Sequence, residues 1–500
     1  MPDDARTAPA AERVSAPATT SDRSQVDRKA RLRIPALLPE KQPAGERVGN
    51  WDEVYALFDP DFAAKEAERC IQCPAAPCQK ACPVGNDIPG ALWLLEQGDI
   101  DGAADIFRET SELPEMCGRL CPQERLCEGH CVVGKKAAPV AIGKLETFVT
   151  ERQRTHGTLP PPQRVPANGL SVAVVGTGPA GIACAERLAR EGYRIVMFDA
   201  WPEPGGILLY GIPNFKQNKP AVERKFRELA ELGIEVVTGT HIGLDIPFER
   251  LARDFDAVFL ATGAPVGARL RVPNEDAPGV FEATEFLVRA NLPAEQLPPG
   301  RREPLPPIRR AIVVGGGDTS MDCVRSAARL GAESVTLVYR RTEAEMQGRA
   351  EERQHATEEG VVTRYLTTPL AVLIDENGRA RGLRCQRMTL GEPDDTGRAR
   401  PEPVAGSEFD LEADAIVIAI GYNVDPVWGE EALGVDRDRW DRFVVDPETM
   451  RTSRPGIFAG GDNVNGADLV VTALEHGHLA ADGIRDYLAG DGPGSLAPTD

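Results

Sequence analysis

Eight of the eleven cysteines lie close together in the first third of the chain. They form two groups with short internal spacings: Cys70, Cys73, Cys78 and Cys82, followed by Cys117, Cys121, Cys127 and Cys131. The first group ends in Cys-Pro, which is typical of the cluster-binding cysteines of bacterial ferredoxins. Structural zinc is the alternative, but it usually needs two short cysteine pairs separated by a spacer, which these evenly spread cysteines fit less well. The pattern favours iron–sulfur clusters over zinc, and Cys184, Cys323 and Cys385 are expected to be buried in the core.

A glycine loop, Gly176–Gly181, follows the apolar stretch Leu170–Val175 and opens the helical stretch Ile182–Glu191. Glycines there let the backbone approach a pyrophosphate, and the helix N-terminus supplies N–H donors. An acid at the end of the next apolar stretch, Asp199, has the position of a ribose-binding carboxylate. The alternative, a glycine-rich turn without a ligand, is disfavoured by this context. The candidate dinucleotide-binding residues are Gly176, Gly178, Pro179, Ala180, Gly181 and Asp199.

A second glycine loop reads Gly315-Gly-Gly317-Asp318-Thr319-Ser320, with serine where the third glycine would stand. The strand that should follow it ends in Tyr339-Arg340-Arg341 rather than in an acid. Guanidinium groups bind a 2′-phosphate, which an acid would repel, so this loop is expected to bind NADPH. Two solvated surface arginines are the alternative. The candidate NADPH residues are Gly315, Gly317, Asp318, Thr319, Arg340 and Arg341.

The first loop is then expected to hold FAD, because its acidic strand end suits an unphosphorylated ribose. A Gly460-Gly461-Asp462 turn before the C-terminal helix has the character of a flavin site. Its carboxylate can hold the ribityl or phosphate region, and the helix N-terminus can stabilise negative charge on reduced flavin. A simple helix cap is the alternative role for Asp462. The remaining candidate flavin residues are Gly205, Gly206, Gly263 and Gly461.

The order strand, glycine loop, helix and strand occurs twice, and Asp256–Gly263 is echoed by Asp414–Gly421. We therefore expect an α/β protein with an N-terminal α-helical iron–sulfur domain and two Rossmann-like dinucleotide-binding domains, the NADPH domain being inserted into the FAD domain. The expected ranges are a flexible tail at 1–45, the cluster domain at 46–165, the FAD domain at 166–295 and 425–500, and the NADPH domain at 296–424. Ile34–Leu38 is a possible docking strand, and Glu343–Glu359 predicts a solvated helix lined by ion pairs.

The formal charge of −20 and the pI of about 4.9 argue against nucleic acid or an anionic membrane surface as the main partner. Hydrophobic residues make up 42% of the chain, which is typical of a folded protein. Met1–Thr20 holds no apolar segment of the signal-peptide type, and apolar runs such as Ala415–Ile420 are far shorter than a membrane helix needs. A cytoplasmic location is expected.

The chain from about Asp59 to Leu488 resembles the small subunit of NADPH-dependent glutamate synthase and its relatives. These include the large subunit of the NADH-dependent reduced ferredoxin:NADP oxidoreductase and the N-terminal half of dihydropyrimidine dehydrogenase. The resemblance rests on Cys70–Pro83, Cys117–Cys127, Ala141–Glu146, Gly176–Gly181, Tyr339–Met346 and Gly460–Asp468. It departs at Gln347, where relatives usually have proline, and this leaves the loop shape near the arginines open.

The resemblance implies one FAD, one NADPH site and two [4Fe–4S] clusters in the cluster domain, with crossed ligation. Cys70, Cys73, Cys78 and Cys131 would hold one cluster. Cys82, Cys121 and Cys127 would hold the other with a fourth ligand that is not cysteine, for which Glu146 is the matching residue. Cys117 is then left over, and it remains the alternative fourth ligand.

The expected function is electron transfer from NADPH through FAD and the clusters to a partner, either a larger FMN-containing synthase subunit or a ferredoxin-linked subunit. No protein acid or base is assigned to catalysis, because hydride transfer between stacked rings needs positioning above all. A subunit of a flavin-bifurcating ferredoxin:NADP transhydrogenase is the alternative. A non-catalytic, zinc-stabilised assembly subunit is the rival from another class, and the two glycine loops, the arginine pair and Asp462 argue against it.

Overall fold

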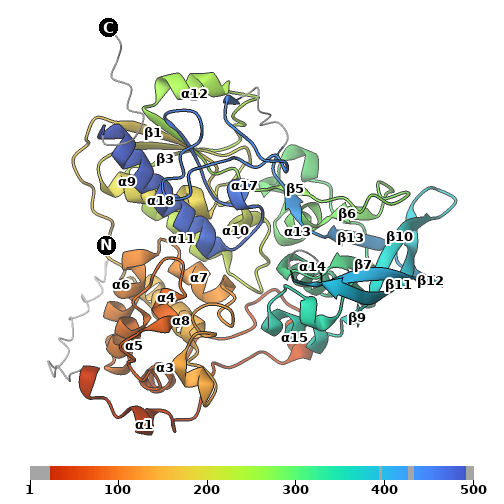
Figure 1. Ribbon diagram of the computed structural model, residues 1–500, viewed down its shortest axis with the longest axis horizontal. Helices are drawn as coiled ribbons and strands as arrows, with labels where there is room; N and C mark the ends of the chain where they lie inside the picture. Colours follow the sequence, from red (N-terminus) through yellow and green to blue (C-terminus); the bar gives the residue numbers. More distant parts are fainter. Residues whose placement is uncertain (1–22, 394–396, 426–432, 491–500) are drawn as a thin grey trace, which may run out of the picture.

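The computed structural model describes residues 23–393, 397–425 and 433–490. A helical domain occupies one corner of the molecule, and two α/β domains lie beside it and beside one another (Figure 1). Residues 1–22 of the expected flexible tail lie outside the described residues. Within the part of the chain that is described, no helix combines the length and apolar character needed to cross a bilayer.

The helical domain begins its helices where the sequence provides caps. Asp59, Asp87 and Asp99 each accept hydrogen bonds from backbone N–H groups of the first helical turn, which would otherwise lack partners. Leu92, Phe107 and Phe148 are buried in its core. With the short helices of the preceding segment, the helices are α1 (Arg28–Arg31), α2 (Ala44–Arg47), α3 (Pro60–Glu68), α4 (Pro77–Lys80), α5 (Ile88–Glu96), α6 (Ile100–Thr110), α7 (Pro114–Leu120) and α8 (Ile142–His156).

The first α/β domain contains a parallel sheet in the order β15-β4-β1-β2-β3. Val172 and Val174 of β1 face one hydrophobic cluster and Ala173 faces another, because helices or loops cover both faces. Its strands are β1 (Ser171–Val175), β2 (Arg194–Phe198), β3 (Glu235–Val237), β4 (Ala257–Leu260) and β15 (Ile457–Ala459). Its helices are α9 (Pro179–Arg190), α10 (Ile207–Tyr210), α11 (Lys219–Leu232), α12 (Phe248–Asp254), α17 (Asp462–Asn465) and α18 (Val470–Leu488).

The second α/β domain is inserted between β4 and β15 of the first, and its parallel sheet has the order β6-β13-β7-β8-β9. The strands are β6 (Val280–Glu282), β7 (Arg310–Gly315), β8 (Ser334–Val338), β9 (Val362–Arg364) and β13 (Ala415–Ala419), with helices α13 (Ala283–Asn291), α14 (Asp318–Arg329) and α15 (Ala350–Glu358). Because β6 pairs with β13, this sheet begins before the boundary expected at residue 296. The short β6 carries no glycine-loop signal that would have assigned it to the second unit.

A three-stranded antiparallel sheet extends from the second α/β domain at the edge of the molecule (Figure 1). It consists of β10 (Thr367–Ile374), β11 (Ala380–Pro393) and β12 (Ala399–Glu412). Two short strands, β5 (Val266–Gly267) and β14 (Tyr422–Asn423), pair where the chain passes between the two α/β domains.

The segment before the helical domain is tied to the rest of the molecule by side chains. Ile34–Leu38 forms no strand, which corrects the expectation. Instead, the Leu37 N–H donates to Glu66, and Arg69 donates to the Ile34 carbonyl. A hydrophobic stretch this short, rich in proline, docks through individual hydrogen bonds rather than through a sheet edge.

The stretch Glu343–Glu359 contains α15 and its ion pairs, as expected, but it is not solvated throughout, because Glu352 and Glu359 are buried against arginines. Glu359 pairs with Arg47 at 2.8 Å, with Arg325 at 2.9 Å and with Arg329 at 2.7 Å. The ring of Phe215, from the first α/β domain, lies within 4.3 Å of both α14 guanidiniums. These buried charges therefore join the N-terminal segment to both α/β domains, although the local sequence resembled that of a surface helix.

Candidate functional site

A cavity of about 390 Å³ lies between the two α/β domains, within the usual volume range of ligand sites. Both glycine-loop regions reach it. The predicted residues that line it are Gly176, Gly178, Pro179, Ala180, Asp199, Gly206, Gly263, Asp318, Thr319, Gly461 and Asp462. The predicted residues outside its lining are Gly181, Gly205, Gly315, Gly317, Arg340 and Arg341.

The glycines of the first loop have two different roles. Gly176 has a φ of +109°, and a side chain there would collide with the carbonyl of Ala261, the residue after β4. A Cβ at Gly181 would collide with the Gly176 carbonyl, whereas a Cβ at Gly178 would meet no atom within 4 Å. Gly181 is thus required for packing the helix on its strand, and Gly178 leaves room beside the cavity for a ligand.

We expect alanine to have different effects at these two glycines, on stability at one and on FAD binding at the other. Gly181→Ala should lower the free energy of unfolding by about 1–3 kcal/mol through overpacking. Gly178→Ala should keep the thermal midpoint of the flavin-free protein and weaken FAD binding. Thermal unfolding of flavin-free protein and titration with FAD would measure the two effects. Equal loss of stability in both variants would contradict the assignment.

Asp199 organises the loop from within the protein. Its carboxylate accepts hydrogen bonds from the Thr177 backbone and hydroxyl and from the Trp201 N–H. The Thr177 hydroxyl in turn accepts from the Gly205 N–H at 2.9 Å. Gly205, although outside the cavity lining, is therefore connected to it. A carboxylate has further lone pairs, so Asp199 retains acceptor capacity toward a ribose hydroxyl.

Three consecutive residues of α18 serve three parts of the molecule. The His476 Nδ1 accepts a hydrogen bond from the Gly461 N–H and so fixes the turn that carries Asp462. Gly477 allows close contact with α9, because a Cβ there would meet the Ala180 carbonyl at 2.5 Å. His478 lies 2.6 Å from Glu112 of the helical domain.

Burial raises the pKa of Asp462 to about 6, although the Asp468 N–H donates to its carboxylate. The folded protein binds this proton more tightly than the unfolded chain, so stability falls as pH rises from about 4 to 6. Asp462→Asn should therefore stabilise flavin-free protein at pH 7 by about 2 kcal/mol and flatten that pH dependence. The same variant should bind FAD about tenfold more weakly if the carboxylate holds the ribityl region. Chemical denaturation across this pH range and FAD titration would check both.

The second glycine loop is covered by the segment that follows the two arginines. The backbone N–H groups of Gln347 and Gly348 both donate to the Gly316 carbonyl, and the Arg349 N–H donates to Asp318 at 3.0 Å. Proline at position 347 could not make the first of these bonds. The departure from the family pattern at Gln347 thus adds a contact to the loop.

The two predicted phosphate-binding arginines differ in environment. Arg340 is exposed, whereas Arg341 is 4% exposed and donates to the Ala399 carbonyl of β12 at 2.8 Å. Solvation of both side chains, the alternative to phosphate binding, therefore does not hold for Arg341. Of the two, Arg340 is the side chain with access to a ligand.

Lys216 and Asp322 form an ion pair that the sequence gave no reason to expect. Their charged atoms lie 2.8 Å apart across the two α/β domains, and both side chains line the cavity. Burial raises the pKa of Asp322 to about 6, and Lys216 counteracts the rise. A single lysine in a loop after Gly-Ile-Pro carries no motif, so only the domain arrangement shows the pair.

Seven of the eight clustered cysteines gather in two sets, each drawing on both sequence groups. Burial raises the pKa of Cys70 to about 12, and three neighbouring thiols raise it further: Cys78, Cys131 and Cys73. We call these four the outer set. Burial likewise raises the pKa of Cys127, and Glu146 and Cys82 are among the groups that raise it further. Cys121 hydrogen-bonds with Cys117 and lies near Glu146 and Cys127. We call Cys82, Cys121, Cys127 and Glu146 the inner set.

The family resemblance assigns clusters rather than single metal ions to these cysteines. Among the described residues, no three histidine, cysteine or acidic side chains are arranged as one metal ion would require. A cubane cluster is larger than an ion and is held by thiolates that need not touch one another. The crossed grouping implied by the resemblance is therefore compatible with the positions of the thiols.

Glu146 is a buried carboxylate whose negative charge is little stabilised by neighbouring groups of the protein. It is 6% exposed, and its carboxylate accepts a hydrogen bond from the Asn86 amide at 3.5 Å. Burial raises its pKa well above the usual value, with Cys117 raising it further. Such a group is costly unless it is neutralised or binds a metal. Cys117 instead packs in the hydrophobic cluster of the first α/β domain, 3.9 Å from the Ser111 hydroxyl.

The helix α7 connects the inner set to the cavity. Leu120, its last residue, lines the cavity, and Cys121 follows directly. Both pack against the hydrophobic cluster that includes β1 and α9. The outer-set thiols belong to, or pack against, the separate core of the helical domain. Cys127 of the inner set also belongs to the core of the helical domain, so it is Cys121 that brings the inner set next to the cavity.

The chain matches known families and proteins over most of its length. Residues 47–158 match the family model described as "Dihydropyrimidine dehydrogenase domain II, 4Fe-4S cluster", and residues 170–477 match "Pyridine nucleotide-disulphide oxidoreductase". The glutamate synthase [NADPH] small chain of Halomonas elongata is 43% identical over 90% of this chain and 96% of its own length. The corresponding Escherichia coli chain is 41% identical with the same coverages.

The chain belongs to the glutamate synthase small-subunit family. A putative oxidoreductase of Escherichia coli, AegA, is also 41% identical, over 90% of this chain and 69% of its own length. The solved structure of FprA from Mycobacterium tuberculosis in complex with NADPH has a TM-score of 0.54 and 18% identity, and it covers 64% of this chain and 85% of that one. It supports the fold alone.

Membership of the glutamate synthase small-subunit family confirms three expectations. The fold is α/β with an N-terminal iron–sulfur domain, and the protein is an NADPH-dependent oxidoreductase with FAD, NADPH and [4Fe–4S] cofactors. The matched N-terminal model is one of iron–sulfur rather than zinc binding, so the zinc-stabilised scaffold finds no support.

Proposed function

We propose that this chain is the electron-input subunit of a larger enzyme and carries electrons from the cavity to the inner set, then to the outer set, and then to a larger FMN-containing synthase subunit. The observation that carries the proposal is the placement of Leu120 in the cavity lining directly before Cys121. Two relatives that the chain covers almost completely are named as glutamate synthase small chains, which favours that type of partner.

The residues divide the work as follows. Bound FAD would take hydride from NADPH and release its electrons singly to the clusters. The loop Gly176–Gly181, Asp199 and the Gly461–Asp462 turn would bind and orient the flavin nucleotide. The second loop and Arg340 would bind NADPH. The proposed ligands are Cys70, Cys73, Cys78 and Cys131 for the outer cluster, and Cys82, Cys121, Cys127 and Glu146 for the inner one.

Anaerobic titration of the purified holoprotein with NADPH would test the internal route. We expect bleaching of the flavin bands and two distinct cluster signals in electron paramagnetic resonance, with the inner signal appearing first after rapid mixing. A protein without flavin absorbance, or with one cluster signal only, would contradict the proposal.

The partner needs a separate experiment. The full chain, tagged and expressed in its host, would be captured and its partner subunit identified by mass spectrometry and FMN analysis. A subunit with an FMN site and glutamine-dependent activity supports the proposal. A ferredoxin-linked subunit would instead support the flavin-bifurcating alternative, which no feature of the described residues favours.

A further inference from the structure

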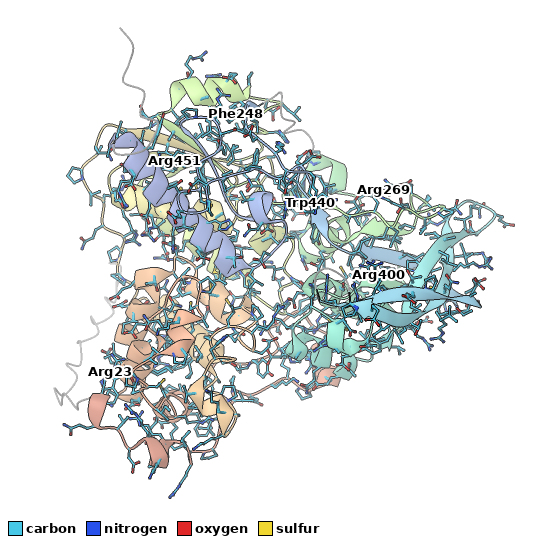
Figure 2. The ribbon with its side chains drawn as sticks, in the orientation of Figure 1. Arg23, Phe248, Arg269, Arg400, Trp440 and Arg451 are labelled. Carbon is cyan, nitrogen blue, oxygen red and sulfur yellow. The ribbon has the colours of Figure 1, made fainter. Side chains whose placement is uncertain are left out.

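Arginines of the N-terminal segment hydrogen-bond to the backbone of the loop Cys70–Cys73. Arg28 donates to the Ile71 carbonyl at 3.2 Å through Nε and to the Gln72 carbonyl at 3.3 Å through Nη2. Arg31 donates to the Cys70 carbonyl at 2.8 Å. Consecutive carbonyls between Cys70 and Cys73 are thus held by side chains roughly forty residues earlier in the chain. Figure 2 shows Arg23, at the start of this segment, at the outer end of the helical domain.

This loop contains a residue with a strained backbone conformation. Gln72 has a φ of +47°, in the left-handed region that residues other than glycine rarely adopt. Its side chain is also fixed, since its amide donates to the Pro89 carbonyl at 3.0 Å and its oxygen accepts from Arg23 at 3.2 Å. Such strained positions persist when surrounding contacts over-determine them.

The two arginines differ in the charge that they bring. Arg31 is neutralised by Glu96, whose carboxylate accepts from both of its terminal nitrogens at 2.6 and 2.7 Å. Among the described residues, no carboxylate pairs with Arg28. Arg28 is exposed, and its positive charge lies beside the Cys70–Cys73 loop, at hydrogen-bond distance from two of its carbonyls.

We propose that Arg28 is a positioning residue for the outer cluster: its guanidinium fork fixes the Cys70–Cys73 loop, and its charge raises the reduction potential of that cluster. Reduction adds one negative charge to a cluster, and a nearby uncompensated cation stabilises the reduced form. The outer cluster would then be a better electron acceptor than the inner one, which favours flow away from the flavin. This inference rests on the two-cluster route proposed above.

The test is a redox titration of the holoprotein, followed by electron paramagnetic resonance, for wild type, Arg28→Gln, Arg28→Lys and Lys29→Gln. We expect Arg28→Gln to shift the oxidised-to-reduced ratio of one cluster about tenfold at a given potential, equivalent to about −59 mV for one electron. The other cluster should keep its potential. Lys29 is the matched control, because it lies on the same short helix, is exposed and makes no side-chain contact with the loop among those described.

The two Arg28 variants separate the effect of the charge from that of the hydrogen bonds. Arg28→Lys keeps the charge but cannot reach both carbonyls in the same fork, so it should retain most of the potential while broadening the cluster signal. Loss of iron from Arg28→Gln would support the positioning role, and the potential would then be measured in Arg28→Lys. Full iron with unchanged potentials and signals in both Arg28 variants would overturn the inference. A wild-type protein without two cluster signals would instead refute the proposed route itself.

Discussion

Replacing Glu146 with alanine is expected to remove the inner cluster and to reduce NADPH-driven electron transfer to an external acceptor by at least about 100-fold. The reason is that Glu146 is near all three inner-set cysteines, since its charge raises the thiol pKa of each of them. Iron analysis should show about half the wild-type iron per chain, and flavin reduction by NADPH should keep its rate. Without the inner cluster, electrons would remain on the flavin side of the helical domain.

Cys117→Ser is the matched control for Glu146→Ala. Cys117 hydrogen-bonds with Cys121, but it is packed with residues of the first α/β domain. If Glu146 is the ligand, the serine variant should retain both cluster signals and most of the electron transfer. The reverse result, with iron lost from Cys117→Ser and retained in Glu146→Ala, would assign the fourth position to the cysteine.

Removing the charge of Arg340 is expected to raise the NADPH Michaelis constant roughly 10- to 100-fold and to leave that for NADH almost unchanged. A charge-assisted hydrogen bond of about 1.5–3 kcal/mol to a phosphate accounts for this range. NADH lacks the 2′-phosphate, so it cannot lose that contact. Steady-state kinetics of Arg340→Gln with both nucleotides would measure the difference, and equal loss for both would contradict phosphate recognition.

Two further variants separate recognition from structure at this site. Arg381 is exposed on the antiparallel sheet, so Arg381→Gln should leave both nucleotides unaffected. Arg341→Gln should also lower thermal stability, because the buried guanidinium holds the Ala399 carbonyl of β12. A variant that changed the kinetics only through folding would affect NADPH and NADH alike.

The features predicted from sequence are those whose signal is local. The loop Gly176–Gly181 was predicted between a strand and a helix, where the structure has it, and the second glycine loop likewise follows a strand and opens α14. Both follow from short patterns in which neighbouring residues decide the backbone. The crossed grouping of the cysteines came only from family resemblance, since spacing alone allows other groupings.

The features that escaped prediction depend on contacts between distant segments. Lys216 and Asp322 meet only after two domains are assembled, and each looks ordinary in its own stretch of sequence. Glu359 appeared to belong to a solvated helix because the charges that neutralise it come from Arg47, Arg325 and Arg329. The start of the second sheet was missed because the three residues of β6 can be recognised as a strand only from their pairing with β13.

The three neighbouring residues of α18 have a consequence for the maturation of the protein. His476 holds the turn of the flavin site, Gly477 seats the helix on α9, and His478 contacts Glu112 of the helical domain. A chain that has not yet bound flavin lacks the partner that this turn is shaped for, and the same turn of helix supports the domain that must receive iron and sulfide. We therefore expect flavin loading and cluster insertion to be coupled, so that flavin-starved cells accumulate a protein that is poor in both cofactors.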